Sequence, residues 1–420
     1  MNGHELMRYS ILKIGFVSSV IMLFLVLRPI VGIWAEHKIG FVNIPVIMTI
    51  GVISIIPFSV LSDYRGYIIK HWLHMDFVVM FLMLYLFVNF ISFALNPKVA
   101  VIDSISEIFR FLSFLAMYLL GRAFFKSHPK RDLILASYVI SVICIDAIGY
   151  CQLASGSFHT SRKVLAIQGT FDHPNMYANF LNLANLACIY FLLQKKYVTI
   201  NSIIIVLNVF LLFNTYSRMA IAVCALMILI LALVYRKQSV YVFLLVVMVG
   251  LFIVYKHPHI IDFWAHRFST IGDPNAIIES RSYIFTSLIY LFKQNLLIGI
   301  GPATFYPHYY HVMPHNELLR NLAEVGLLGT IPFVFMWGTI VKRFFSFDYF
   351  VKRSRYDQQK LFIFLMILVV IITSLTANIG TQQELLWPLF LLFGSYGNRE
   401  EKKHAGHEHI QNQPIIRQNI

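Results

Sequence analysis

The chain has 420 residues, of which 58% are hydrophobic and 13% are charged, and its net charge is +14. A soluble domain carries about 25% charged residues, so the composition excludes an ordinary soluble enzyme. The positive charge is typical of basic cytoplasmic loops in a membrane protein, and without a basic stripe on a soluble face it predicts no nucleic-acid partner.

Apolar blocks about 20 residues long, the length that crosses about 30 Å of hydrocarbon, recur along the chain. The first begins near Ile11, and because no small-residue cleavage site follows it we expect a retained span rather than a cleaved signal. The sequence predicts an all-α polytopic membrane protein with about 12 transmembrane helices. The expected spans are 11–34, 39–62, 75–95, 102–121, 132–154, 173–193, 198–213, 219–235, 240–255, 326–341, 361–379 and 384–398.

One loop is long, residues 256–325, and it is rich in His, Pro, Tyr and Gly. With the N-terminus in the cytoplasm, 22 of the 34 Lys and Arg residues fall on the cytoplasmic side and 10 on the other, which places this loop outside. A further span at 282–298 would move the basic 342–360 loop outward, so this apolar stretch is expected to be an interfacial or re-entrant helix. A bacterial enzyme on that side has no ATP or nucleotide sugars, and its donor must already be activated.

The four cysteines lie in or at the ends of apolar blocks and predict neither a disulfide framework nor a zinc site. They are Cys144, Cys151, Cys188 and Cys224.

A histidine before an expected helix is the strongest candidate for chemistry. Asn316 is a good N-cap, and Gly326 permits a break before the next span. His315 then lies at the N-terminal end of the helix, where the positive helix end favours a neutral ring that accepts a proton, and also favours an anion. A solvated loop histidine is the alternative. Four residues form one apolar helical stripe: Leu318, Leu319, Leu322 and Val325.

His308 and His311 precede His315 with metal-like spacing, so zinc ligation is conceivable. The intervening Pro and Tyr residues give no regular ligand face, and the nearest acid, Glu317, belongs to the capped helix. We therefore expect no metal and no cofactor.

Two arginines are candidate phosphate ligands, because a guanidinium binds phosphate oxygens in bidentate fashion and stays charged. Arg218 opens a span at the outer interface, where a snorkelling anchor is the alternative. Arg281 begins the apolar helix of the long loop, and an ion pair with Glu279 is the alternative there.

Residues 169–179 form another outer loop that opens a span. His173 or Asn175 is expected to cap the helix, and Asp172 is expected to orient a basic group or bind a sugar hydroxyl. Simple capping is the alternative for the whole loop.

These motifs together resemble the superfamily of O-antigen ligases and O-antigen polymerases of the bacterial envelope. The strongest match is His-Asn followed after nine residues by Gly-x-x-Gly, which is His315, Asn316, Gly326 and Gly329. Supporting matches are Ser217-Arg218, Arg281, Gly299-x-Gly301 and the G-T-F-x-H-P-N loop at 169–175. Met219 departs from the family, which often has Gly there.

The resemblance implies a GT-C-like fold with short helices in the periplasmic loop. It implies a glycosyltransferase in the bacterial inner membrane with its active site facing the periplasm. The donor would be a glycan linked to undecaprenyl diphosphate, and the acceptor either lipid A-core or a second lipid-linked glycan. His315 matches the catalytic base and Arg218 and Arg281 the two essential arginines, with Asn316, Asp172, His173 and Asn175 as substrate-binding candidates.

By this resemblance the chain divides into N-terminal transmembrane helices (1–168), a ligase-like region (169–345) containing the 256–325 loop, C-terminal transmembrane helices (346–398) and a cytoplasmic tail (399–420). Ligase and polymerase are not separated by these motifs. A flippase or secondary transporter is the alternative from another class, because Arg28 and Arg110 lie within expected spans. A binding or sensor protein that uses the long loop is a third.

Overall fold

The structure is a computed structural model. It describes residues 3–34, 38–39, 42–61, 76–96, 101–156, 166–235, 274–306, 314–347, 349, 357–378, 380 and 382–397.

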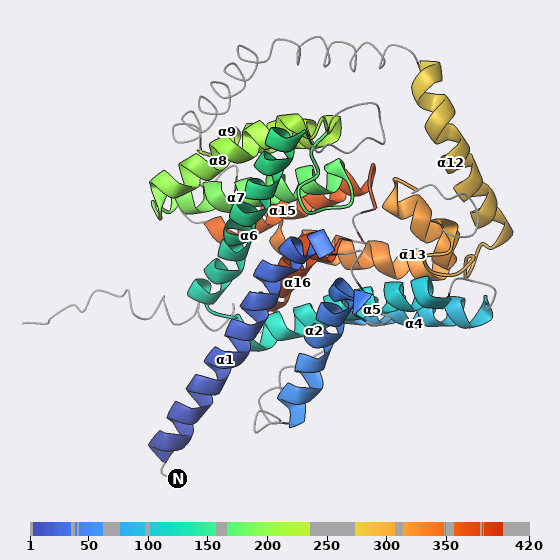
Figure 1. Ribbon diagram of the computed structural model, residues 1–420. Coiled ribbons are helices and arrows are strands. Elements are labelled where there is room, and N and C mark those ends of the chain that lie inside the picture. The colour runs from blue at the N-terminus through green and yellow to red at the C-terminus, as the bar shows by residue number, and fades with distance from the viewer. Residues whose placement is uncertain are drawn as a thin grey trace, which may run out of the picture.

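The described residues form a helical protein (Figure 1). The α-helices are α1 (Gly3–Ile30), α2 (Ile44–Leu61), α4 (Phe77–Leu95), α5 (Val101–Phe124), α6 (His128–Ser155), α7 (Pro174–Leu193), α8 (Val198–Asn214), α9 (Arg218–Tyr235), α12 (Pro274–Gln294), α13 (Glu317–Phe344), α15 (Gln358–Ser374) and α16 (Gln383–Ser395). A short 3-10 helix η1 (Val31–Trp34) follows α1, and β1 (Lys38–Ile39) pairs antiparallel with β2 (Val42–Asn43) in a minimal hairpin.

Most of the expected spans coincide with these helices. Six helices are long and apolar enough to cross a membrane, namely α4, α5, α6, α7, α9 and α13, and shorter apolar helices occur within α1, α2, α8 and α15. The expected span at 240–255 lies outside the described residues. The all-helical multi-pass architecture is confirmed, and the count of 12 spans stays a prediction.

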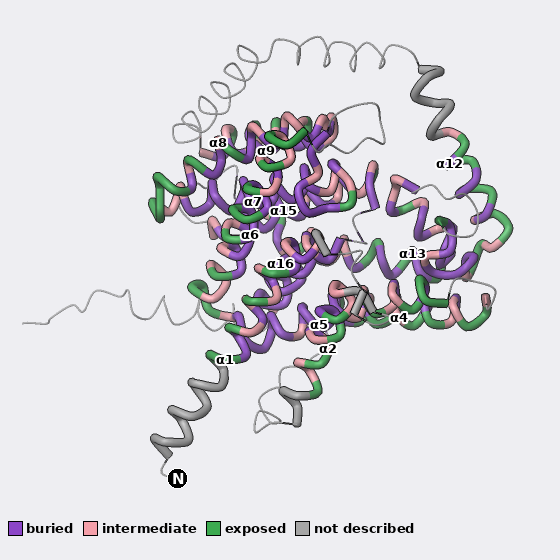
Figure 2. Tube along the Cα trace, viewed as in Figure 1, coloured by how far each residue is buried: buried purple, intermediate pink, exposed green. Residues whose placement is uncertain are grey.

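Many large apolar side chains are exposed on the outside of the bundle, where exposed residues are green in Figure 2. Phe77 and Phe87 of α4 are 63% and 60% exposed, and Leu233 of α9 is 58% exposed. In contrast, α7 and α16 are buried along nearly all of their length. Water would penalise so much exposed apolar surface, so the natural solvent of the outer helices is lipid.

The helix ends separate into two rims, one of which we call the histidine rim because it carries His173 and His315. At this rim Thr170 Oγ1 donates to Pro29 O (2.6 Å), which joins the start of α7 to the end of α1. Asn316 Nδ2 donates to Leu375 O (3.2 Å), which joins the start of α13 to the end of α15.

The opposite rim is held by polar contacts around Asp132 of α6. Its carboxylate accepts hydrogen bonds from Tyr190 Oη (2.7 Å), Lys196 Nζ (2.8 Å) and Gln359 Nε2 (2.9 Å). Arg343 at the end of α13 also lies at this rim. The alternation of helix starts and ends between the rims is the pattern expected for successive antiparallel spans.

Helix α13 is broken at Gly326, which has φ +63° and ψ −165°. The break was expected from the sequence and is confirmed. The backbone groups freed there pair with residues 296–301: Leu327 N donates to Leu296 O (2.9 Å), and Ile300 N donates to Ala323 O (2.9 Å). Within a membrane an unpaired backbone group costs several kcal/mol, so this pairing is what permits a broken helix.

The two glycine motifs meet at this break. A Cβ on Gly326 would overlap the backbone of Leu297, and a Cβ on Gly299 would overlap the backbone of Glu324. Both glycines also have positive φ, +63° and +73°. Close backbone packing therefore explains the first glycine of each motif, Gly299 and Gly326.

Helix α12 contains most of the 282–298 stretch. It runs across the direction of α4, α5 and α13 (Figure 1), and it packs on α13 through a small separate core that includes Ile284, Leu288 and Ala323. It is not among the helices long and apolar enough to span. This arrangement supports the expected interfacial position, which stays a prediction.

Candidate functional site

His315 lies immediately before α13 in a constrained backbone. Asn316 is the N-cap, as expected, because its Oδ1 accepts a hydrogen bond from Leu319 N (2.9 Å). His315 itself has φ +52°, a left-handed conformation that is uncommon for residues other than glycine. Such conformations cluster at functional sites, where the surrounding structure holds them.

The 169–175 loop is fixed by side chains from neighbouring helices. Gln152 of α6 holds both sides of Gly169, accepting from its N–H (2.9 Å) and donating to its carbonyl (2.8 Å). His173 is the N-cap of α7, and its Nδ1 accepts from Asn175 N (3.1 Å). Of the two expected caps, His173 is therefore the one in use, and Asn175 supplies the N–H that it accepts.

The loop and the start of α13 meet at the two histidines. The ring centroids of His173 and His315 are 6.4 Å apart, with an angle of 58° between the rings. Two residues 142 positions apart in the chain thus form one imidazole pair between the N-terminal ends of α7 and α13. Both helix ends favour negative charge, which makes the space beside the pair suited to an anion.

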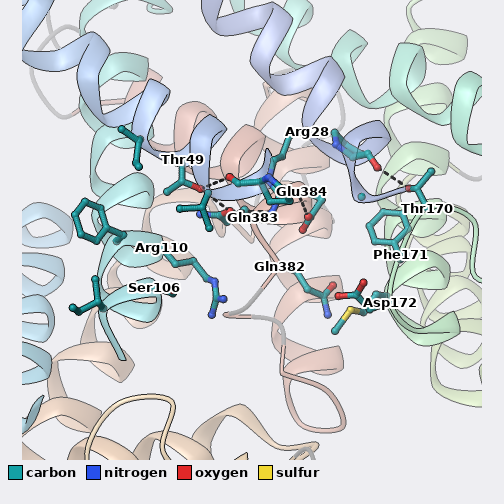
Figure 3. A pocket seen from close by; sticks show the side chains of 18 residues that line it. Arg28, Thr49, Ser106, Arg110, Thr170, Phe171, Asp172, Gln382, Gln383 and Glu384 are labelled. Carbon is teal, nitrogen blue, oxygen red and sulfur yellow. Dashed lines mark hydrogen bonds and ion pairs between the residues drawn. The ribbon is translucent and has the colours of Figure 1, made fainter. Parts of the chain in front are cut away.

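A cavity of about 640 Å³ adjoins this pair through Asp172, which precedes His173 (Figure 3). It lies between the end of α1, the start of α2, the first half of α5, the loop before α7 and the start of α16. The lining consists of Arg28, Pro29, Gly32, Pro45, Val46, Thr49, Ile50, Ile105, Ser106, Phe109, Arg110, Thr170, Phe171, Asp172, Met176, Gln382, Gln383 and Glu384.

Arg28 is built into the wall of this cavity. It forms an ion pair with Glu384, donates to Gln383 Oε1 (3.1 Å), and lies 5.8 Å from the centroid of the Trp387 ring. A charge placed within a membrane helix needs such partners. Sequence reasoning missed its role, although the occurrence of an arginine in an expected span was a signal of a functional site.

Arg218 is the first residue of α9 and is half-buried. The preceding turn contains Tyr216 in a left-handed conformation (φ +52°), and Ile167 N donates to Asn214 O (3.3 Å), which joins this turn to the chain before the 169–175 loop. Burial raises the pKa of Tyr216, so its phenol stays protonated and can donate a hydrogen bond.

Arg281 belongs to α12, and its side chain lies outside what the structure describes. His308 and His311 also lie outside the described residues. Within the described ranges, no group of three or more His, Cys, Asp or Glu side chains has a metal-binding arrangement.

The apolar stripe expected on α13 is not its most buried face. Leu318 is 39% exposed, whereas Glu317, Arg320, Asn321 and Glu324 are buried. These charged residues face the protein interior because α5 supplies an ion-pair partner for Arg320. The residue pattern of a single helix does not reveal such a partner on another helix.

The partner is Glu107 of α5, which forms ion pairs with both Arg320 and Arg110. Arg320 Nε also lies 3.2 Å from Glu324 Oε2. Because Arg110 lines the cavity and Arg320 lies one turn after His315, Glu107 connects the cavity wall to the histidine helix. Removal of one partner of such a buried pair is strongly destabilising.

One comparison with known proteins covers part of this region. Residues 203–334 match the family model described as O-antigen ligase. The matched segment contains Arg218, Arg281, His315 and both glycine motifs, whereas the 169–175 loop lies before it. No curated protein matches the chain. The resemblance inferred from the motifs is confirmed for this segment, which matches the O-antigen ligase family.

Proposed function

We propose that the protein transfers a glycan from undecaprenyl diphosphate to a sugar hydroxyl at the periplasmic face of the bacterial inner membrane. The observation that carries the proposal is the position of His315 within the O-antigen ligase match, paired with His173 beside a cavity lined by both charged and apolar side chains. The acceptor is lipid A-core for a ligase, or a second lipid-linked glycan for a polymerase.

His315 takes the proton from the acceptor hydroxyl, a general-base step that contributes about 10²–10⁴-fold. The acceptor oxygen forms a bond to C1 of the donor sugar, and the bond from C1 to the diphosphate oxygen breaks. Undecaprenyl diphosphate leaves with that electron pair. Direct displacement inverts the anomeric centre.

Arg218 and Arg281 hold the diphosphate and stabilise the charge that develops on it. Asn316 fixes the start of α13, and therefore the position of His315, through its cap and its bond to Leu375. His173 and Asp172 face substrate at the edge of the cavity, and Asn175 supports His173.

The orientation is supported by charge. The opposite rim carries the basic residues Lys130, Arg131, Lys196 and Arg343, as a cytoplasmic rim does. The histidine rim is then periplasmic. No specific observation in the described part of the chain favours the flippase or transporter alternative.

The test is reconstitution of the purified full-length protein in liposomes with the lipid-linked glycan extracted from the host strain. Lipid A-core and a second portion of lipid-linked glycan are offered separately as acceptors. We expect the glycan to join one of them, with release of an equal amount of undecaprenyl diphosphate. Movement of the donor across the bilayer without a new glycosidic bond would contradict the proposal.

A further inference from the structure

The cavity of about 640 Å³ contains an unsatisfied amide. Gln382, immediately before α16, is only 2% exposed, and neither its Nε2 nor its Oε1 has a hydrogen-bond partner among the residues that the structure describes. It makes no capping bond to α16. A buried amide without partners is destabilising, so a ligand that supplies partners here is favoured.

The adjacent glutamine shows the contrast. Gln383 Oε1 accepts from Arg28 Nη2 (3.1 Å) and Thr49 Oγ1 (3.1 Å), and its Nε2 donates to Ser113 Oγ (3.1 Å). Gln383 is thus part of the wall. Gln382 lines the same cavity near Asp172 (Figure 3) with both of its polar atoms unused.

The lining charges are balanced. Two arginines, Arg28 and Arg110, lie among two carboxylates, Asp172 and Glu384. Arg28 is paired with Glu384, and Arg110 is paired with Glu107. A site for a diphosphate needs an excess of positive charge, which this cavity does not have.

The remaining lining suits a neutral, hydroxyl-rich ligand. Hydroxyl groups both donate and accept hydrogen bonds. They therefore match the amide of Gln382, the carboxylate of Asp172 and the guanidinium of Arg110, which line this cavity. Arg110 points its guanidinium into the open space (Figure 3), and Phe109, 40% exposed, adds an apolar ring surface for the C–H face of a sugar. The volume is within the range of about 300–1,000 Å³ of ligand sites.

We propose that this cavity binds sugar residues of a glycan substrate, with Gln382 as a specificity-determining residue and the diphosphate bound elsewhere. This inference rests on the proposed function and identifies the cavity as the binding site for part of a glycan substrate. All of the lining residues lie outside residues 203–334. Selection among glycans would therefore reside in α1, α2, α5 and α16, apart from the segment that matches the ligase family.

The test uses the full-length protein and the variants Gln382→Ala and Phe109→Ala. Phe109 is partly exposed, so its variant keeps the test valid if Gln382→Ala does not fold. Gln194→Ala is the matched control, because it removes an amide of the same kind that bonds to Gln358 (2.5 Å) at the opposite rim.

Transfer kinetics are measured with donor and acceptor varied separately. We expect Gln382→Ala to raise KM for one glycan substrate about 3- to 10-fold, the effect of one or two lost hydrogen bonds, with kcat changed less than about twofold. The substrate whose KM rises identifies the bound glycan as donor or acceptor. Unchanged KM values for both substrates in both cavity variants would overturn the proposal.

Binding separates this inference from the transfer reaction. Undecaprenyl diphosphate without sugar should bind equally to the wild type and to both cavity variants. Oligosaccharide released from the host's envelope polysaccharide should show saturation-transfer NMR signals with the wild type that weaken in both variants, even if the wild type catalyses no transfer. Weaker binding of the sugar-free diphosphate to Gln382→Ala would show that the cavity holds the diphosphate instead.

Discussion

The rings of His173 and His315 lie side by side, with centroids 6.4 Å apart, at the N-terminal ends of α7 and α13. His173 caps α7 through Nδ1, so in the neutral ring its proton is on Nε2. One ring is thus tied to a helix, and the other is held in a left-handed backbone. The pair therefore places a ring fixed by a helix cap beside the ring that we propose as the base.

The two roles of His173 can be separated by substitution. Asn is a good N-cap, so His173→Asn should keep the unfolding temperature while it removes the imidazole. We expect kcat for glycan transfer to fall about tenfold because the ring beside the base is lost. Full activity in His173→Asn would show that His173 only caps α7.

The break in α13 should be intolerant of a side chain. Gly326→Ala places a Cβ against the backbone of Leu297 at a positive φ, so we expect a loss of at least about 2 kcal/mol and poor recovery of folded protein. Gly338→Ala is the control in the same helix, because nothing lies within 4 Å of its Cβ, and it should stabilise by up to about 1 kcal/mol. Thermal unfolding in detergent measures both. Equal stability of the two variants would contradict the packing argument.

The arginines are tested by changes that keep the charge. Arg218→Lys and Arg281→Lys lose the bidentate fork, so we expect loss of most of the transfer activity and weaker binding of the lipid-linked donor. Arg353→Lys, in an expected cytoplasmic loop, should behave as the wild type. If Arg218→Lys and Arg281→Lys also match the wild type in transfer activity and in donor binding, the two arginines are interfacial anchors.

Orientation is tested by cysteine labelling. In a background without the four native cysteines, single cysteines at Tyr309 and Ser354 are treated with an impermeant reagent in intact cells. The 22-to-10 division of basic residues predicts labelling at 309 and none at 354. The reverse pattern would place the histidine rim in the cytoplasm and exclude the proposed donor chemistry.

Local features of the fold were predictable from the sequence. The Asn316 cap and the Gly326 break follow from the properties of single residues, and the apolar blocks fix most helix positions to within a few residues. The pairings between helices were not predictable. Arg28 and Glu384 are 356 positions apart, and nothing in either local pattern indicates the other.

The same limit applies to the site. The motifs identified His315 and the 169–175 loop separately, and only the structure shows that they meet. The apolar stripe on α13 suggested the wrong buried face because Arg320 of the charged stripe pairs with Glu107, which lies on another helix. Gln382 carried no sequence signal, since its importance comes from the partners that it lacks.

The central claim is that His315 is the base of a glycan transfer reaction. Removal of the ring should affect chemistry far more than donor binding. His315→Ala tests this, and His315→Asn is the companion variant, because Asn tolerates the left-handed backbone at φ +52° better than most residues other than glycine.

The decisive measurement is glycan transfer by each purified His315 variant, with binding of the undecaprenyl-diphosphate glycan determined on the same samples. We expect transfer to fall by at least about 10²-fold in both variants, while donor affinity stays within about threefold of the wild type. Transfer near the wild-type rate in either folded variant would show that His315 is not the base.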